Sequence, residues 1–526
     1  MASLKQFLTL FDLAEAANYP EISEYLDCIK QSSFELNDWL TQGLQQVLGD
    51  DPRLGIMLHP AVVLAVTQFA VARHTQIKQS TLEPITLPSF SSLKEMEAVR
   101  LNEPHHKLLS QLINPDFDFS QLNAVDWGEH DGTNYTAVTH PAPISTQSSA
   151  VTQVTYGMPV LKRLAFSLIS RGQVKFLRKL PALPQAKRHA VLREQWFASL
   201  DKTGRSHDEL ALALYVVLTA PCYMAEYAAQ ALVNARYFNQ KLNALATGPE
   251  MIRKPEIAAL IADVKYTEKP IFGIQHGGNA GQIDPRWNEI AEECFVSHFG
   301  TWGYTIAEHD EVMPNLKLST VFSKPLSLVS MPSNDKVLVV VQYISNQIQH
   351  GFHSPSFTRQ TGSVKSALKM IGDACPGYKI HIRSHPLNNK QDLIDNLDLA
   401  QYSNIEFVEG SRGTIAEDAK HYQAVLFTTP SGTGHSECLD AGIPFLVVCE
   451  RNDVWLRPQN QDVYQQLLDS KIWVTSTDQL SEHVAKAFLP SDTSTSSYQT
   501  FYQRFVGVSS GYLSRWIAAF AKIQTK

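Results

Sequence analysis

The feature that most constrains the fold is a regular alternation of apolar and helical segments in the C-terminal half of the chain. Residues 337–344 (VLVVVQYI) form a β-branched run that is typical of a buried parallel strand. Similar runs at 378–386, 404–410, 424–430 and 443–450 alternate with predicted helices at 363–375, 390–399, 414–421 and 434–441. Short connections between such elements indicate a doubly wound parallel sheet, in which ligands bind beyond the carboxyl ends of the strands.

The N-terminal half combines predicted helices with further strands. Leucines recur at helical spacing in residues 1–80, and residues 161–245 are also predicted to be helical. Their most apolar stretch, Leu210–Ala220, is shorter than the ~20 residues that a membrane span needs, and it indicates a buried helix. Apolar strands are predicted within 269–281 and 294–304.

Length and composition exclude several classes of protein. A chain of 526 residues predicts roughly two to four domains. Hydrophobic residues make up 44% and charged residues 18%, and the net charge of −7 argues against a protein that coats nucleic acid. The six cysteines form no CxxC pair and the N-terminus has no long apolar core, so reduced thiols in a cytoplasmic protein are expected.

Residues 428–437 (TTPSGTGHSE) give the most informative local pattern. After a strand that ends at Phe427, small and hydroxyl-bearing residues lead into a helix, whose exposed N–H groups and dipole can hold a phosphate. A plain N-cap with a tight turn is the alternative interpretation, and the lysine of a Walker loop is missing. The predicted nucleotide-binding residues of this segment are Thr428, Thr429, Ser431, Gly432, Thr433 and Glu437.

Two further strand ends carry polar residues of suitable chemistry. Arg383, His385 and Pro386 follow the strand KIHI, and arginine and histidine side chains suit contact with a phosphate or a carboxylate. Glu406 and Glu409 belong to the next strand, where a carboxylate can accept hydrogen bonds from ribose hydroxyls. Taken singly, these are also the features of an incidental loop and of surface glutamates. Together with the hydroxyl-rich turn, they predict a nucleotide site.

The loop QHGGNAG follows a predicted strand in the N-terminal half. Its glycines let a ligand approach the backbone, and its predicted substrate-binding residues are Gln275, Gly277, Gly278 and Asn279. His276 is the first candidate for a general base, although a structural histidine fits the pattern equally well. Other carboxylates that can serve as the base are Asp310, Glu308, Asp126 and Glu129. Neither HExxH nor a strand-end Asp-x-Asp occurs, so no metal site is predicted.

A basic segment lies within the predicted helical region. From Arg171 to Arg193 the sequence has lysines and arginines but no acid. One interpretation is a solvated face, and the other is a surface for an anionic acceptor or an anionic membrane leaflet.

The loop and its surroundings resemble the signature of a bacterial family of transferases in surface-carbohydrate biosynthesis. That family has a QHGG-x-x-G stretch, an acidic helix and a threonine–tryptophan–glycine strand, and the matching residues here are Gln275–Gly278, Gly281, Glu289 and Thr301–Gly303. Its proline–tyrosine–glutamate element is similar to Pro221–Tyr227, and its C-terminal turn is similar to Ser431, Thr433 and Glu437. The resemblance covers roughly residues 220–475 and makes Glu226 a catalytic candidate and Trp302 a substrate-binding one.

A more distant resemblance, to bacterial capsule Kdo transferases and GT-B sialyltransferases, concerns the donor. Those enzymes hold a CMP-activated ulosonic acid with a His-Pro at one strand end, a Glu after the next strand and a Ser/Thr pair after the following strand. The same order here is His385-Pro386, then Glu406 or Glu409, then the hydroxyls of 428–433. The resemblance implies that His385 and the hydroxyls contact phosphate and that one Glu contacts ribose. This sequence has no clear counterpart of the sialyltransferase catalytic aspartate.

Together, the patterns and resemblances imply an α/β, GT-B-like fold of two Rossmann-like lobes with a helical N-terminal extension. The expected domains are an acceptor-side lobe at 1–330, a nucleotide-sugar lobe at 331–495 and a C-terminal helix at 496–526 that crosses back to the first lobe. The expected function is cofactor-free, metal-independent transfer of an acidic sugar of the sialic, pseudaminic or Kdo type. The expected donor is a CMP-sugar, and the expected acceptor is a glycan, a lipid-linked molecule or a protein. The expected location is the cytoplasm or the inner membrane surface, with the basic segment 171–193 as the membrane contact. The alternatives are a UDP- or GDP-sugar transferase, a GT-B epimerase and a non-catalytic nucleotide-binding scaffold.

Overall fold

The computed structural model divides into two compact units. The first comprises Met1–Ile274, Trp287–Phe299 and Ile517–Lys526, and the second comprises Gln275–Arg286 and Gly300–Trp516. The residues that the structure describes are 22–74, 85–86, 108–109, 112–119, 125–126, 152–154, 160–172, 174–176, 189–240, 242–248, 255–275, 277–278, 280–282, 287–305, 310–314, 326–341, 357–385, 397, 399, 402–408, 414–450, 456–485, 492–506 and 512–524.

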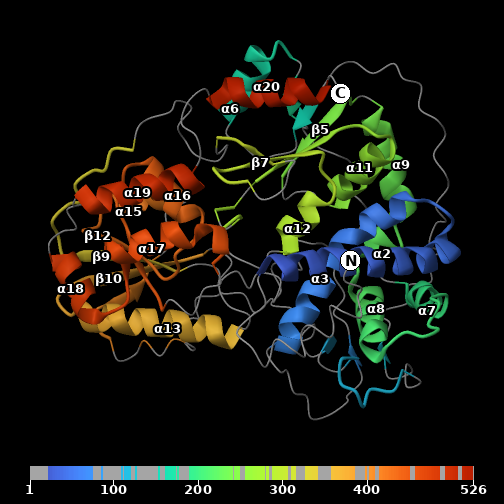
Figure 1. The fold of residues 1–526 in the computed structure, drawn as a ribbon, viewed down its shortest axis with the longest axis horizontal. Coiled ribbons are helices and arrows are strands. Elements are labelled where there is room, and N and C mark those ends of the chain that lie inside the picture. The colour runs from blue at the N-terminus through green and yellow to red at the C-terminus, as the bar shows by residue number, and fades with distance from the viewer. Residues whose placement is uncertain are drawn as a thin grey trace. The chain divides into compact units, whose positions relative to one another are not determined.

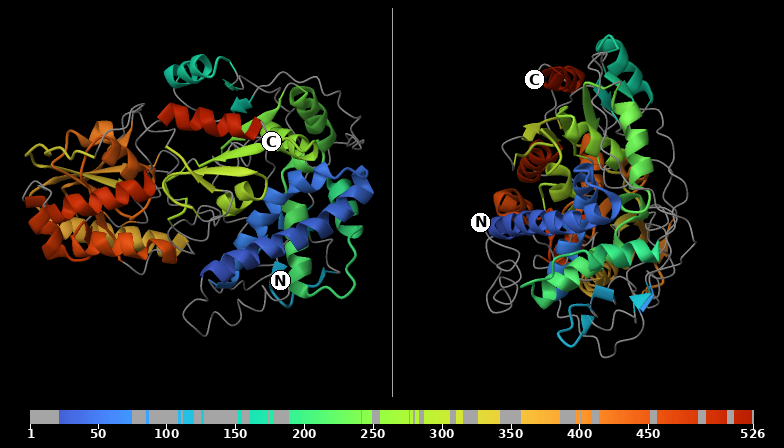
Figure 2. Two further views of the ribbon diagram at one scale, coloured as in Figure 1. Left: turned by 45° about the horizontal axis from the view of Figure 1, so that its top comes forward. Right: turned by 90° about the vertical axis from the view of Figure 1, so that its right-hand side faces the viewer.

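Helices dominate the described part of the first unit. They are α2 (Ile22–Leu48), α3 (Arg53–His74), α6 (Val160–Ile169), α7 (Ala190–Ala198), α8 (His207–Thr219), α9 (Ala228–Asn239), α11 (Pro255–Tyr266), α12 (Trp287–Glu293) and the end of α20 (Tyr512–Gln524), with a 3₁₀ turn at Cys222–Met224. Figures 1 and 2 show α2 and α3 side by side, and α3 also packs against α8, α11 and α12. Leu36, Leu40 and Leu44 lie fully buried on one face of α2, because residues four apart share a helix face.

A six-stranded sheet begins in the first unit. Its order is β4 (Val174–Phe176), β3 (Thr152–Val154), β5 (Ala244–Thr247), β6 (Ile271–Ile274), β7 (His298–Thr301) and β8 (Asp310–Val312). The pairs β3–β4, β3–β5 and β5–β6 are parallel, and β5 and β6 are buried along their whole length. Two short strands, β1 (Ile85–Thr86) and β2 (Val125–Asp126), pair separately.

The second unit contains a parallel sheet of the classical dinucleotide-binding order. Its strands lie in the order β11 (Ile405–Phe407), β10 (Lys379–Ser384), β9 (Lys336–Val341), β12 (Ala424–Phe427), β13 (Leu446–Val448) and β14 (Trp473–Val474). Counted along the chain, this is 3-2-1-4-5-6, with the order reversing between β9 and β12. Five of the six residues of β9 are buried, as expected for a central strand covered on both faces.

Helices cover both faces of this second sheet. They are α13 (Phe357–Ala374), α15 (Ile415–Ala419), α16 (Thr433–Asp440), α17 (Gln461–Asp469), α18 (Thr477–Ala485) and α19 (Asp492–Phe505), with a 3₁₀ turn at Pro458–Asn460. Figure 1 shows α13 on one side of the strands and α16 with α19 on the other. This arrangement places the β9–β12 boundary between helices that leave toward opposite faces, which is where doubly wound sheets bind ligands.

The predicted fold class is confirmed. The protein is an α/β protein with parallel pairing in both six-stranded sheets, a Rossmann-like strand order in the second and a helical N-terminal region, and Leu210–Ala220 lies almost entirely in the buried helix α8. One local prediction was wrong: the segment 161–245, expected to be helical, also contains β4 and the start of β5. The region 496–526 is helical as expected in its described part, which is divided between the end of α19 and α20.

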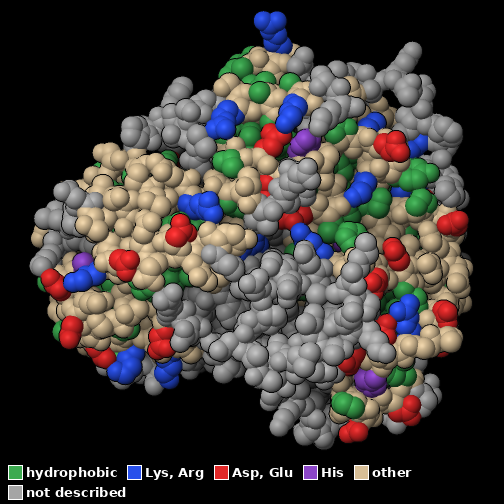
Figure 3. Space-filling model, in the orientation of Figure 1, with side chains coloured by type: hydrophobic (Ala, Val, Ile, Leu, Met, Phe, Trp, Pro, Cys, Tyr) green, Lys and Arg blue, Asp and Glu red, His purple; other side chains and the backbone are tan. Residues whose placement is uncertain are grey.

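Surface charge and hydropathy agree with the composition. On the face drawn in Figure 3, acidic and basic side chains are interspersed over the described surface. In the described segments, no helix combines the length and apolar character needed to cross a membrane.

Candidate functional site

The register of the second sheet brings the ends of β9, β10 and β12 to one edge. Ser384 pairs with Val341, the last residue of β9, and Phe427 pairs with Val340. The backbone N–H of His385 donates to Val341 O at 3.0 Å, and the N–H of Thr428 donates to Val340 O at 3.3 Å. The segments that follow β9, β10 and β12 therefore start at the same edge, next to the reversal of strand order.

The N-terminus of α16 lies at this edge and has no side-chain cap. Its N-cap is Gly432, whose φ of 145° favours glycine and which has no side chain to accept a hydrogen bond from the first-turn N–H groups. Ser431 and His435 are fully buried and Gly434 is also buried. A buried helix start whose N–H groups lack a cap is suited to an anionic ligand, because those groups and the helix dipole carry partial positive charge.

The loop after β6 packs directly against this helix start within the second unit. The N–H of Gly278 donates to Thr433 Oγ1 at 3.1 Å. A Cβ placed on Gly278 would lie 2.4 Å from the carbonyl carbon of Gly432 and 2.6 Å from the nitrogen of Thr433. The glycine is therefore needed for close approach of two backbones. The structure thus brings together the two motifs, QHGGNAG and TTPSGTG, that the sequence places far apart.

Buried side chains hold this loop in place. The amide of Gln275 donates to Gly277 O at 2.8 Å and accepts from the N–H of Trp302 at 2.7 Å. Asn460 donates to Gly281 O at 2.6 Å, and the Tyr464 hydroxyl donates to the Gln282 side chain at 2.7 Å. Gln275 and Trp302, both predicted to bind substrate, are buried and support the loop.

The predicted phosphate ligand Arg383 already has an acidic partner. Its Nη1 lies 2.5 Å from a carboxylate oxygen of Asp418 and donates to Thr414 O at 3.0 Å. Glu437, predicted to be a nucleotide ligand, accepts a hydrogen bond from the N–H of Ile415 at 2.8 Å and so ties α16 to the start of α15. Predicted ligand His385 has an exposed side chain at the same edge. Arg383, Glu437 and His385 thus lie at the same edge of the sheet. Arg383 and Glu437 already form ion-pair or hydrogen-bond contacts within the protein.

Glu406 occupies a different level of the sheet from the other candidates. It pairs in register with His381, three residues before the end of β10, which corresponds to roughly 10 Å along a strand. Its carboxylate lies 2.9 Å from His381 Nε2, and His381 Nδ1 lies 2.9 Å from the Tyr422 hydroxyl. The pairing removes Glu406 from the carboxyl edge where a nucleotide would bind.

His435 is an uncharged internal residue of the turn. Its ring stacks on Phe427 with centroids 3.9 Å apart, and its Nε2 lies 3.0 Å from Thr429 O. Complete burial lowers the pKa of His435 to about 3, so that its imidazole is neutral at physiological pH. With the Thr429 hydroxyl donating to Ser431 O at 2.9 Å, it fixes the conformation of residues 429–435.

The catalytic candidate Glu226 lies in the first unit and forms a buried ion pair. Arg193 donates to its two carboxylate oxygens, from Nε at 2.7 Å and from Nη2 at 2.8 Å. The N–H of His189 donates to the same carboxylate at 3.1 Å, and Arg193 also donates to Val217 O. Such a bidentate pair, closed off from solvent, ties α7 to α8 and to the turn before α9.

This pair also corrects the inclusion of Arg193 in the predicted basic surface at 171–193. Arg193 is fully buried against Glu226, so it cannot belong to a surface for a membrane or an anionic acceptor. Arg171 and Lys175 are exposed. The remaining basic residues of the segment lie outside the described residues, namely Arg178, Lys179, Lys187 and Arg188.

Several predicted residues lie outside the described part of the chain. Asp310 is described, at the start of β8, and is partly buried. The side chains that are not described are those of His276, Asn279, Pro386, Glu409, Asp126, Glu129, Glu289 and Glu308. Among the described side chains, no group of three or more His, Cys, Asp or Glu residues is placed to hold a metal.

Sequence reasoning missed the residues that organise the site from a distance. The T-x-x-E pattern at Thr414–Glu417 is a capping-box signal, and it correctly marks the start of α15 that carries Asp418. Asn460 and Tyr464 gave no comparable signal, because their bonds to the loop at 281–282 span 179 and 182 residues.

Comparisons with known proteins agree with this picture at the level of family. The sequence pattern of the LIC12162 family transferases matches residues 131–489, more than half of the chain. No curated protein matches it. Among solved structures, it is similar to S. aureus MnaA with UDP (11% identity, 71% of this chain and 95% of that chain, TM-score 0.38). It is also similar to the UDP-GlcNAc 2-epimerase from Neisseria meningitidis bound to UDP-GlcNAc (12% identity, 71% and 99%, TM-score 0.34).

Proposed function

The chain belongs to the LIC12162 family of transferases, and we propose that it is a glycosyltransferase that binds its nucleotide-sugar donor at the carboxyl edge of the second sheet. The observation that carries this proposal is the buried, uncapped start of α16 beside the reversal of strand order. Hydroxyl-bearing and glycine residues surround it, so a phosphate can reach the backbone N–H groups of Thr433 and Gly434.

The donor that this edge fits best is a CMP-linked acidic sugar. A diphosphate donor carries more charge than a monophosphate and calls for more cations in a site without metal. The guanidinium of Arg383 is already compensated by Asp418. A helix terminus, hydroxyls and the exposed His385 match a single phosphate more closely, as does the His-Pro, Glu, Ser/Thr order of the sequence.

The proposed base is His276, with the acceptor hydroxyl as its substrate. Among the sequence candidates, Glu226 is held by a bidentate, buried arginine, which argues against it as the base. His276 belongs to the glycine-containing loop Gln275–Gly281. Gly278, two residues after His276, contacts the start of α16, where the donor phosphate is proposed to bind.

A thermal-shift series on the full chain tests the nucleotide site. We would measure melting with CMP, CDP, UDP, GDP and ADP, each with and without EDTA, because a ligand at 100 times its Kd stabilises the fold by about 2.7 kcal/mol. The expected result is a shift with CMP that EDTA leaves unchanged. Ser431→Ala and His385→Ala should reduce this shift, and Ser481→Ala, a hydroxyl on α18 bonded to Ala374 O, serves as the matched control.

Each other outcome assigns a different function. A shift with UDP or GDP in place of CMP would replace the donor and keep the site. Turnover of a donor without acceptor would identify an epimerase or hydrolase. Activity that is retained in the His276→Ala variant would contradict the assignment of His276 as the general base. If no nucleotide changes the melting temperature, the proposed site is contradicted and the interpretation as a non-catalytic scaffold is favoured.

A further inference from the structure

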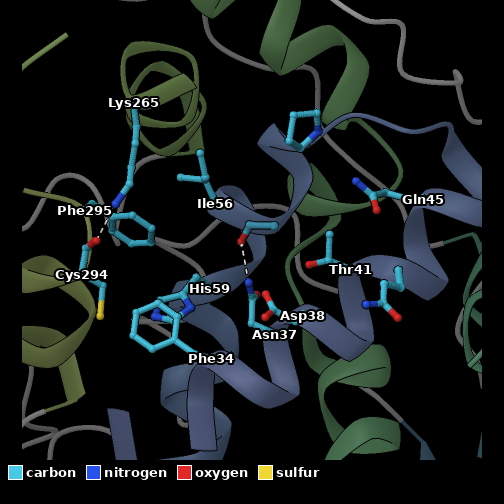
Figure 4. A pocket seen from close by; sticks show the side chains of 13 residues that line it. Phe34, Asn37, Asp38, Thr41, Gln45, Ile56, His59, Lys265, Cys294 and Phe295 are labelled. Carbon is cyan, nitrogen blue, oxygen red and sulfur yellow. Dashed lines mark hydrogen bonds between the residues drawn. The ribbon is translucent and has the colours of Figure 1, made fainter. Parts of the chain in front are cut away.

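The first unit contains a cavity that the proposed nucleotide site does not use. It has a volume of about 420 Å³ and lies among α2, α3, the end of α11 and the turn after α12. Figure 4 shows that its walls come from Phe34, Asn37 and Thr41 of α2, His59 of α3, and Lys265 of α11. A volume of this size is typical of small-molecule sites, which run from roughly 300 to 1,000 Å³.

Three buried polar atoms at this cavity have no hydrogen-bond partner among the described residues. They are Asn37 Oδ1, Thr41 Oγ1 and His59 Nε2, on side chains that are 7%, 9% and 2% exposed. The Asn37 amide is oriented by its Nδ2, which donates to Gly55 O at 3.1 Å, so its oxygen is left as an acceptor. Buried polar groups are almost always paired in folded proteins, and the three at this cavity are therefore available to a polar ligand.

The cavity also has an aromatic wall. The rings of Phe34 and His59 lie with centroids 4.7 Å apart, and those of His59 and Phe295 lie 5.4 Å apart. Phe34 keeps 44% of its surface exposed, which is unusual for so large an apolar side chain. The face of an aromatic ring carries partial negative charge and attracts polarised C–H groups, such as those on one side of a sugar ring.

The charges around the cavity balance. Lys265 donates to Cys294 O at 2.6 Å, and Asp38 lies at the rim on the α2 side (Figure 4). Burial lowers the pKa of His59 to about 4, so that its ring is neutral, and the pKa of the Cys294 thiol is raised to about 11 by burial. One cation and one anion with neutral groups between them favour an uncharged ligand, and they provide no reactive thiolate.

We propose that this cavity binds a neutral, hydroxyl-rich ligand of the size of a sugar ring. The hydroxyls of such a ligand can donate to Asn37 Oδ1 and to the Asp38 carboxylate, and they can accept from Lys265. At Thr41 and His59 a hydroxyl can either donate or accept. A C–H face of the ring can lie on the Phe34 ring. A hydroxyl suits all of these positions because it can both donate and accept. The inference does not depend on the nucleotide site, since all the lining residues belong to the first unit.

Saturation-transfer NMR on the full chain without nucleotide tests the proposal. The probes are the methyl glycosides of glucose, galactose and N-acetylglucosamine, with glucosamine as a cationic comparison and N-acetylneuraminic acid as an anionic one. We expect at least one neutral glycoside to receive saturation at millimolar concentration and both charged sugars to receive none. Absence of transfer to every neutral glycoside, or transfer to a charged sugar alone, would overturn the proposal.

Thr41→Val gives a readout that a purely structural hydroxyl would not give. Because the hydroxyl has no partner in the fold, its replacement by a methyl group should leave the melting temperature unchanged or raise it. The same change should weaken binding of the glycoside about fivefold, the effect of losing one hydrogen bond. Unchanged affinity in a stable Thr41→Val variant would contradict the assignment.

A matched pair on α2 provides a second test with little risk to folding. Gln42 lines the cavity and Gln46 does not, and both are exposed. Gln42→Ala should weaken glycoside binding, whereas Gln46→Ala should leave it unchanged. Equal effects of the two changes would place the glycoside elsewhere. Neither change should alter a nucleotide-induced thermal shift, so failure here and failure of the proposed transferase site are distinguishable.

Discussion

The backbone N–H of Gly278 donates a hydrogen bond to the hydroxyl oxygen of Thr433 at 3.1 Å, across a sequence separation of 155 residues. This bond holds the glycine-rich loop against the start of α16, where the proposed donor phosphate binds. We therefore expect loop conformation and phosphate binding to be coupled through the Thr433 side chain.

Thr433→Val should destabilise the second unit and weaken nucleotide binding together. The change leaves the N–H of buried Gly278 without its acceptor, which costs about 1–2 kcal/mol of unfolding free energy. Urea unfolding and nucleotide titration measure the two effects. Thr433→Ser keeps the hydroxyl and should restore both. Normal stability and affinity in the valine variant would show that this bond is dispensable.

Gly278→Ala should be more damaging than its small volume suggests. The added Cβ meets backbone atoms of Gly432 and Thr433 at 2.4–2.6 Å, and backbone cannot move aside as a flexible side chain can. We expect a loss of about 1–3 kcal/mol in stability, as for overpacked cores, and a loss of nucleotide binding. Gly362→Ala is the control: nothing lies within 4 Å of its Cβ, and alanine favours the helix α13. Similar unfolding curves for the two variants would refute the close-packing argument.

Substitutions in the buried pair of Arg193 and Glu226 can test whether Glu226 has a structural or a catalytic role. Glu226→Gln leaves an uncompensated buried guanidinium and should cost about 3–5 kcal/mol of unfolding free energy. Lys369→Ala at the exposed pair with Asp373 should leave the unfolding free energy nearly unchanged, because solvent screens such a pair.

Activity per folded molecule then decides between the two roles. Replacing both partners, as in Arg193→Met with Glu226→Leu, should recover stability and keep transferase activity if the pair is structural. A stable but inactive double variant would return Glu226 to the list of catalytic residues.

Acidification should destabilise the fold partly through His435. The pKa of His435 is about 3 in the fold, against an ordinary histidine pKa of 6.5, so in the pH range between these values the unfolded chain gains a proton while folded His435 does not. The contribution is complete above about pH 6.5 and is lost as the pH falls, by up to about 1.4 kcal/mol per pH unit. In urea unfolding, His435→Phe should reduce the slope of stability against pH relative to wild type. An unchanged slope would mean that other groups account for the acid sensitivity.

The two glutamates near β11 should respond differently to neutral substitution. Glu406 is paired with His381 three residues before the end of β10, so Glu406→Gln should leave the Kd for nucleotide within about twofold. Glu409→Gln should weaken nucleotide binding about tenfold if this glutamate binds the ribose, as expected for a charged hydrogen bond. The reverse pattern in titration calorimetry would move the ribose contact to Glu406.

Local sequence determined the class of fold and the positions at which chemistry was to be expected. The β-branched run of β9 predicts a strand that is buried on both faces, because an uninterrupted run of five apolar residues is typical of a central strand in a parallel sheet. The hydroxyl-rich turn after Phe427 and the helix that follows it could also be predicted from the sequence, because capping and glycine preferences act over a few residues. Arg383, His385 and Thr428 were correctly expected at strand ends, and parallel strands place such ends at one edge.

Only the tertiary structure decided which of these elements meet. The order 3-2-1-4-5-6 sets β9 beside β12, although 82 residues lie between Val341 and Ala424, and it is this order that creates the edge where the donor is proposed to bind. The contact of Gly278 with Thr433, the burial of Arg193 by Glu226 and the pairing of Glu406 with His381 share the same cause. Each depends on which faces pack together over long sequence separations, and hydrophobic periodicity within one element carries no information about that choice.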